Sequence, residues 1–206
     1  MRRTIKHSTA AFAMTAVLAL TGCAAGEDEA APDGSADTST ASAASSEAER
    51  LLAERGLDGM DTVELIDHLD RLGGTDRPDD LFASVRPDQL VLAAGDVETA
   101  VPIPDDRFYL SIAPYLDQTH ECFNHSLTTC TGELASTPVQ VRIVDDSTDD
   151  VLVDETVTTF ANGFVGFWLP RDIEAELEIS YDGRTARSDI GTGDEDPTCL
   201  TTLQLT

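Results

Sequence analysis

Four side chains that carry sulfur or ring nitrogen lie within eleven residues in the middle of this chain. They are His120, Cys122, His125 and Cys130, in a sequence that has four cysteines and four histidines altogether. Thiolate sulfur and imidazole nitrogen are ligands that suit the thiophilic ions Cu(I) and Zn(II). This segment therefore predicts a metal site, to which Cys199 near the end of the chain could add a third sulfur.

A structural disulfide is the main alternative for these cysteines, because exported proteins are oxidised. Cys122 and Cys130 could pair and close a small loop, which would leave Cys199 as an odd thiol. An odd cysteine in an exported protein usually has a reactive or metal-binding role. The chain has neither the Cys-x-x-Cys pair of thioredoxin-like oxidoreductases nor the Gly-x-Ser-x-Gly motif of hydrolases. We therefore expect a binding protein and not an enzyme.

The N-terminus has the layout of a bacterial export signal. Residues 1–22 begin with basic side chains and continue with an apolar stretch that is too short to span a membrane. They end in Leu20-Thr21-Gly22, directly before Cys23, and this run resembles the lipobox of bacterial lipoproteins. The resemblance implies a lipoprotein signal peptide at 1–22 and lipidation of Cys23, palmitate included. The mature protein would then be anchored to the cell membrane and face outside the cytoplasm.

Composition separates a tether from the folded part. After Cys23, the residues up to Ser46 are almost wholly Ala, Ser, Thr, Asp, Glu, Gly and Pro, which cannot bury enough apolar surface to offset their ordering. We expect a disordered tether over 23–46. The formal net charge of −26 rules against nucleic acid as a partner, because phosphate contacts need a basic surface.

A small helical region is expected over 47–88. Ser46 with Glu49 and Asp61 with Glu64 each have the spacing of a capping box in front of an apolar stripe. The segment 77–85, which has a proline at an early turn position, predicts a third short helix.

From Gln89 onward the apolar residues alternate with polar ones, which is typical of strands. Asn162-Gly163 and Asp182-Gly183 are strong hairpin signals. We expect an α+β protein with a mostly antiparallel β-sandwich-like domain at 89–206, which holds the metal site. The expected strands are 89–93, 107–113, 139–145, 150–159, 163–169, 174–181, 184–190 and 199–205.

The expected strands place the candidate ligands in two different settings. Cys199 should share the core face of its strand with Leu203 and Leu205, at the mouth of the sandwich. The segment from His120 to Cys130 shows neither alternation nor a helical stripe, so we expect an irregular loop.

Several segments resemble the CueP family of periplasmic or lipid-anchored copper-binding proteins. They are FYLSIAPYLDQTHECFNHSLTTCTGEL, DDLFASVRPDQLVL, GFVGFWLPRDIEAELEISYDG and DPTCLTTLQL, and the resemblance extends from about Leu51 to Thr206. It implies copper binding by three cysteines, which match Cys122, Cys130 and Cys199 here, and a role in copper resistance. It also implies a possible copper-accepting partner such as a superoxide dismutase. The resemblance assigns no ligand role to His120 or His125.

We therefore predict an extracytoplasmic protein that sequesters and delivers Cu(I) through Cys122, Cys130 and Cys199, with His120 or His125 as auxiliary ligands. Thiolates select Cu(I), for which two or three sulfurs suffice, whereas Zn(II) would need four ligands such as three cysteines and one histidine. Two alternatives stay open: a thiol protein that reduces Cu(II) to Cu(I), and a structural surface lipoprotein with one disulfide.

Overall fold

The computed structural model describes residues 36–206, and the side chains from Ser45 onward. Residues 1–35 lie outside this description, and they include the predicted signal peptide and the predicted lipidation site Cys23. Ser35–Thr206 form one compact unit. Helices at the start and mostly antiparallel sheets after them confirm the expected α+β class.

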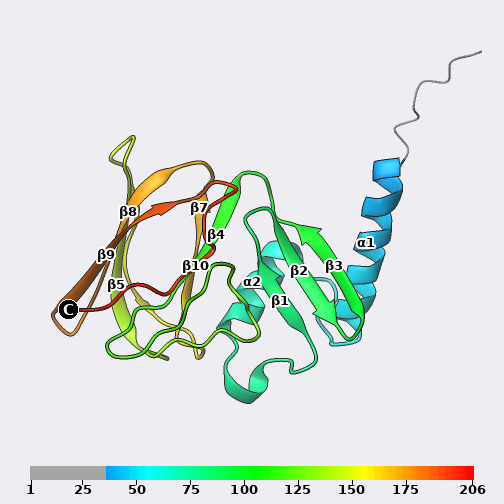
Figure 1. Cartoon of the computed structure of the whole chain (residues 1–206), viewed down its shortest axis with the longest axis horizontal. Coiled ribbons are helices and arrows are strands. Elements are labelled where there is room, and N and C mark those ends of the chain that lie inside the picture. Colours follow the sequence, from blue (N-terminus) through cyan, green and yellow to red (C-terminus); the bar gives the residue numbers. More distant parts are fainter. Residues whose placement is uncertain (1–35) are drawn as a thin grey trace, which may run out of the picture. The chain divides into compact units, whose positions relative to one another are not determined.

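Helix α1 (Ala36–Ala53) begins ten residues before the expected helix start at Ser46. The residues from Ala36 to Ser46 are therefore helical in the structure and do not continue the tether. Ala48, Leu51 and Leu52 bury one end of α1 in the core. Because alanine has the highest helix propensity, a helix anchored at that end can extend through the alanine-rich segment before it. Figure 1 shows α1 alongside β3.

Helix α2 (Thr62–Arg71) begins at the predicted capping box. Asp61 accepts a hydrogen bond from the backbone of Glu64, whose side chain accepts one from the backbone of Asp61. Its buried face contains Leu65, Ile66 and Leu69, and also Asp70. The helix is followed by a single 3-10 turn, η1 (Gly74–Asp76).

The third predicted helix is wrong, because Phe82–Val85 form strand β1. This strand pairs antiparallel with β2 (Gln89–Ala94), and β2 pairs with β3 (Val97–Pro102), which was not predicted. Arg86 donates its backbone N–H to the carbonyl of Gln89, so Pro87-Asp88 form the turn of a hairpin. Pro87 is well suited to this turn, and Pro78, at which the helix was expected to begin, lies before β1 in irregular chain.

Two further sheets form the sandwich. One has the order β6-β5-β8-β9, from β5 (Pro138–Asp145), β6 (Val151–Thr158), β8 (Glu174–Tyr181) and β9 (Arg184–Gly191). The other has the order β10-β4-β7, from β4 (Arg107–Ile112), β7 (Val165–Pro170) and β10 (Cys199–Leu200). Figure 1 shows β5, β8 and β9 facing β4 and β7 across one apolar core. The Asp182-Gly183 hairpin is confirmed between β8 and β9.

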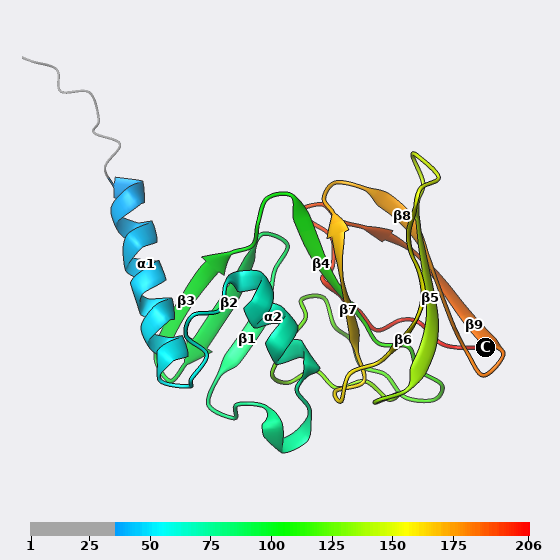
Figure 2. The same cartoon turned by 180° about the vertical axis from the view of Figure 1, so that it is seen from behind.

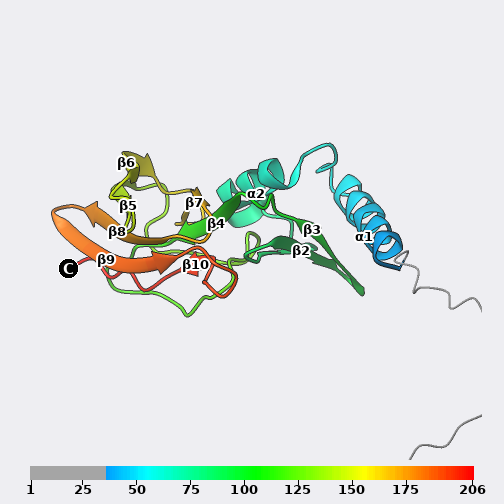
Figure 3. The same ribbon diagram turned by 90° about the horizontal axis from the view of Figure 1, so that it is seen from above.

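Strand β4 separates two hydrophobic cores, because both of its faces are buried. Phe108, Leu110 and Ile112 point into the sandwich. Tyr109, between them in sequence, belongs to the second core, which α1, α2, β1 and β2 form on the other side. Figures 2 and 3 show α2 beside the β4–β7 pair, opposite the larger sheet. Alternate residues of β4 thus reach the helical side, where the candidate site lies.

The position of Cys199 differs from the prediction. It is buried beside Ala113 and Phe164, whereas Leu203 and Leu205 lie in the sandwich core. The expected strand 199–205 is regular only at Cys199–Leu200, where β10 pairs parallel with β4. Because the chain beyond Leu200 is irregular, counting by alternation from Leu203 back to Cys199 gave the wrong face. Among residues 36–206, no helix has the length and apolar character needed to cross a membrane.

Candidate metal centre

The loop that follows β4 is held against the edge of β1. The carbonyl of His125 accepts from the N–H of Val85, and the N–H of Leu127 donates to the carbonyl of Ala83. A short stretch of the loop therefore extends the sheet of β1, β2 and β3. The expectation of an irregular loop is confirmed for the rest of it, and Arg77 fixes its far end by donating to the carbonyl of Cys130 at 2.6 Å.

A close backbone contact fixes the other side of the loop. Gly132 donates its N–H to the carbonyl of Asn162 at 2.7 Å. Gly163 has a φ of +86°, and a side chain there would collide with the backbone of Gly132. The Asn162-Gly163 signal therefore marks a turn between strands of two different sheets and not a two-residue hairpin.

The fold brings Cys122, His125, Cys130 and Cys199 together. Each offers one ligand atom, and these four atoms all lie within 4.8 Å of one another. Two of the four residues, His125 and Cys199, are buried, whereas Cys122 and Cys130 are partly exposed. The three cysteines that the sequence singled out thus meet in space, together with one of the two candidate histidines.

The disulfide in this cluster joins Cys122 to Cys199 and not to Cys130. Their Cα atoms lie 5.6 Å apart, within the usual range for a disulfide. Cys130 is the free cysteine of the described residues, and its Sγ lies 3.6 Å from Sγ of Cys122. The alternative pairing of Cys122 with Cys130 is therefore wrong for this structure, because β10 carries Cys199 to the loop.

His125 is fixed through its backbone. Its N–H donates to the hydroxyl of Thr198 at 3.0 Å, and its carbonyl accepts from the N–H of Val85 at 2.8 Å. The ring packs against Phe164, with a centroid distance of 4.6 Å. Its Nδ1 atom lies 3.7 Å from Sγ of Cys199 and so faces the sulfurs.

The other ring nitrogen of His125 meets a buried carboxylate at the end of α2. Nε2 lies 2.7 Å from Oδ1 of Asp70, and both side chains are fully buried. Asn162, Tyr109 and Ser111 also donate to this carboxylate, at 2.9, 2.6 and 3.1 Å. Four partners thus surround Asp70, and their hydrogen bonds offset the cost of burying its charge.

These contacts shift the protonation of the cluster. Burial alone would lower the pKa of His125, but the charge of Asp70 and the hydrogen bond to it raise this pKa to about 9. Burial would raise the pKa of Asp70, but the charge of His125 and the hydrogen bonds it receives lower that pKa overall. Burial also opposes ionisation of Cys130, yet a hydrogen bond and the charge of His125 hold the pKa of this thiol below its ordinary value. In the metal-free site Asp70 therefore favours a protonated His125, and that charge makes the Cys130 thiol easier to ionise than an ordinary thiol.

We expect His125 of the metal-free protein to titrate near pH 9, because its pKa is raised from 6.5 to about 9. A raised pKa in the fold means that protonated His125 contributes its full stability below about pH 6.5 and loses it as the pH rises through about 9. Titration of the ring resonances by NMR measures the midpoint. In Asp70→Asn the main cause of the upward shift is gone, so the midpoint should fall by about one unit or more. An unchanged midpoint would mean that Asp70 does not set this pKa.

His120, the second candidate histidine, lies outside the cluster. It is exposed, and its ring meets Phe164 edge-on at 6.2 Å between centroids. Phe164 also packs against His125, and His120 is not among the four residues whose ligand atoms meet. A cavity of about 250 Å³ next to His120 is lined by Gln118, Thr119, His120, Thr131, Gly132 and Glu133.

Sequence reasoning missed Asp70, whose contact with His125 joins α2 to the cysteine loop. A signal was present: Asp70 follows Ile66 by four residues, so it lies on the apolar face of α2. An acidic residue in an apolar stripe indicates a buried charge that must have partners. Its partners come from the loop, β4 and the turn before β7, and no local pattern predicts them.

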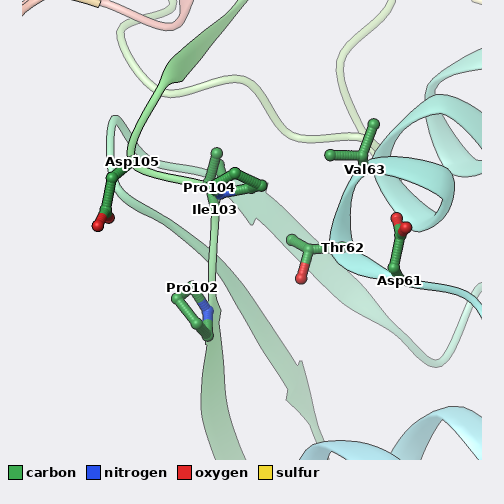
Figure 4. Close-up of a pocket in the computed structure, with 7 residues that line it drawn as sticks. All are labelled: Asp61, Thr62, Val63, Pro102, Ile103, Pro104 and Asp105. Carbon is green, nitrogen blue, oxygen red and sulfur yellow. The ribbon is translucent and has the colours of Figure 1, made fainter.

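A cavity elsewhere in the molecule has no ligand chemistry of this kind. Figure 4 shows this space of about 470 Å³ between the start of α2 and the segment after β3, lined by Asp61, Thr62, Val63, Pro102, Ile103, Pro104 and Asp105. It contains neither cysteine nor histidine, so the candidate site is the sulfur cluster.

The donor set fits a thiophilic ion. Metal–sulfur bonds of about 2.3 Å place the donors of a trigonal or tetrahedral site about 4 Å apart. A cluster whose ligand atoms lie within 4.8 Å therefore needs only small movements to close around one ion. Sulfur donors on Cys122 and Cys199 become available once their disulfide is reduced, and Cys130 and Nδ1 of His125 complete the set.

Comparison with known proteins gives the family of this chain. No curated protein matches the chain. The solved structure described as "Crystal Structure of S.CueP" is 40% identical in sequence and has a TM-score of 0.72, over 77% of this chain and 96% of that one. The family model "Periplasmic copper-binding protein CueP" matches residues 64–204, which include the four residues of the cluster, Asp70 and most of the fold. The chain belongs to the CueP family of periplasmic copper-binding proteins.

Proposed function

We propose that this protein sequesters copper outside the cytoplasm as Cu(I), held by the thiolates of Cys122, Cys130 and Cys199 with Nδ1 of His125 as an added ligand. The observation that carries the proposal is the meeting of three sulfurs and one imidazole nitrogen within 4.8 Å. Soft thiolates favour Cu(I), and a buried site shields that ion from water and oxygen. Membership of a copper-binding family supports the choice of metal. Holding copper in this way would serve copper resistance.

Titration under anaerobic conditions tests this proposal. The protein is reduced, freed of the reductant, and titrated with Cu(I) against a chromogenic Cu(I) chelator. We expect one Cu(I) per chain and protection of all three thiols from alkylation. Zn(II), which three cysteines and one histidine would also suit, is the comparison metal. If copper protects fewer than three thiols, the three-thiolate site is excluded.

A second function, reduction of Cu(II), has its own supporting observation. The structure contains a disulfide between two residues of the cluster and a free thiol 3.6 Å from one of its sulfurs. Two thiolates, Cys122 and Cys199, can each give one electron to a Cu(II) ion, which yields two Cu(I) and this disulfide. Cys130 and His125 would remain to hold one of the two Cu(I) ions.

Counting products separates this redox function from simple binding. Reduced protein mixed with excess Cu(II) should release or retain two Cu(I) per chain, and mass spectrometry of the digest should find Cys122 linked to Cys199 with Cys130 free. If no Cu(I) forms, or if the new disulfide contains Cys130, this reaction is excluded.

Lipidation of Cys23 remains a proposal, motivated by the lipobox-like run that ends at this residue. We expect Cys23→Ala to release the protein from membranes or to leave its precursor unprocessed. Fractionation of cells, with mass spectrometry of the mature N-terminus, measures this. Ser46→Ala is the control variant, and it should leave membrane anchoring unchanged. A Cys23→Ala protein that remains lipidated, mature in size and bound to membranes would exclude the lipobox.

A further inference from the structure

We propose that Asp70 is a positioning residue of the copper site: it holds the Nε2–H of His125, so that the Nδ1 lone pair points at the sulfurs. This inference rests on the proposed copper site and adds a residue from α2, outside the cysteine loop. It assigns the coordinating atom, Nδ1, and the group that selects it.

The surroundings of His125 leave Nδ1 as its available ligand atom. Thr198 and Val85 occupy its backbone N–H and carbonyl, and Asp70 occupies Nε2 at 2.7 Å. Nδ1 faces the cluster, 3.7 Å from Sγ of Cys199. Rotating the ring by 180° would break two contacts at once, because Nε2 would leave Asp70 and Nδ1 would leave the sulfurs. Packing of the ring on Phe164, at 4.6 Å, opposes that turn.

Asp70 can impose this orientation because it is itself held. Oδ1 accepts from Asn162 as well as from His125, and Oδ2 accepts from Tyr109 and Ser111. Asn162 cannot reverse its amide freely, since its Oδ1 accepts the backbone N–H of Phe164 at 2.8 Å. Four side chains from three segments of the fold therefore fix the carboxylate before any metal arrives.

The chemical consequence concerns the neutral imidazole that binds a metal. An imidazole with one proton has that proton on either ring nitrogen, and a hydrogen bond to one nitrogen decides which. A carboxylate facing Nε2 keeps the proton there and leaves the lone pair on Nδ1, which also becomes a better donor. Asp70 thus contributes to copper binding without touching the ion.

Nitrogen NMR of the protein labelled at histidine tests the assignment directly. In protein loaded with Cu(I), we expect Nε2 of His125 to remain protonated and Nδ1 to show the shift of a metal-bound nitrogen. A metal-bound Nε2, or ring nitrogens that do not respond to Cu(I), would overturn the inference. This readout needs no variant, so it decides the matter even if changes at Asp70 impair folding.

Affinity of the variant Asp70→Asn provides the second test. It is measured near pH 9.5, above the pKa of about 9 of His125, so that competition from the proton on the imidazole is small. Loss of a carboxylate that orients a ligand typically weakens metal binding about 10- to 100-fold, and we expect at least a tenfold loss here. Asp67→Asn is the matched control, because it makes the same change on the same helix at a carboxylate that accepts from Trp168 at 2.9 Å and contacts neither Asp70 nor the imidazole.

The outcomes separate this inference from the proposed function. Wild-type protein that does not bind Cu(I) contradicts the function itself. Wild-type binding with an unchanged Asp70→Asn affinity overturns the role of Asp70 alone. Equal losses in Asp70→Asn and Asp67→Asn would also overturn it, because they would indicate general damage to α2 and its packing and not control of His125.

Discussion

Replacing Cys199 with serine is expected to weaken Cu(I) binding by more than about 100-fold in the reduced protein. Losing a residue that only orients a ligand costs about 10- to 100-fold, so losing a thiolate that contacts the ion should cost more. Serine has nearly the same size, and Cys199 is buried where β10 pairs with β4, so the fold should be retained. Competition with a Cu(I) chelator, under anaerobic and reducing conditions, gives the change in affinity.

The two histidines supply matched controls for this measurement. His125→Ala should weaken binding at least as much as Asp70→Asn does, by about 10- to 100-fold, but less than Cys199→Ser does, since nitrogen is a poorer donor to Cu(I) than a thiolate. His120→Ala should leave the affinity unchanged, because His120 is exposed and lies outside the cluster. An unchanged affinity in Cys199→Ser would exclude the three-thiolate site and leave Cys199 as one half of a structural disulfide.

Local patterns in the sequence predicted most of the sandwich. Alternation located β5, β8 and β9, and Asp182-Gly183 marked the hairpin between β8 and β9. Both signals depend only on residues that are neighbours in the sequence. The same reasoning failed at β1, where a helix was expected to start near Pro78 and to continue through residues that form a strand. It failed again beyond Leu200, where the chain leaves the regular strand and alternation no longer applies.

The candidate site shows a similar limit. Residue chemistry was sufficient to select the three cysteines and to expect a loop around two of them. Spacing offered a bond between Cys122 and Cys130 as an alternative, whereas the structure pairs Cys122 with Cys199, which is 77 residues away. His125, and not His120, lies in the cluster, and its ring contacts Asp70, a residue 55 positions earlier in the chain. Contacts between distant segments decide these details, and a single sequence does not contain them in a local pattern.

Reducing the disulfide between Cys122 and Cys199 is expected to destabilise the metal-free protein by about 4 kcal/mol. The bond closes a loop with a sequence separation of 77 residues, which includes β5 to β9. In the chain-entropy account, opening a loop of this length returns about 4 kcal/mol of conformational freedom to the unfolded chain. That is a large share of the free energy of unfolding of most domains, which is roughly 5–15 kcal/mol. Urea unfolding of the oxidised and reduced proteins, both without metal, measures the difference.

Copper should reverse much of this loss, because an ion bound by all three thiolates joins the same two segments. Cu(I) at about 100 times its dissociation constant would restore roughly 3 kcal/mol to the reduced protein. Cys130→Ser separates the two links: it keeps the disulfide and its effect on stability, but it should recover less from Cu(I) in the reduced state. A difference below about 1 kcal/mol between the oxidised and reduced proteins would contradict a structural contribution from this bond. The cysteines would then serve copper binding and not the stability of the fold. The cysteine loop would be held in place by Asp70, by Arg77 and by the contact between Gly132 and Gly163.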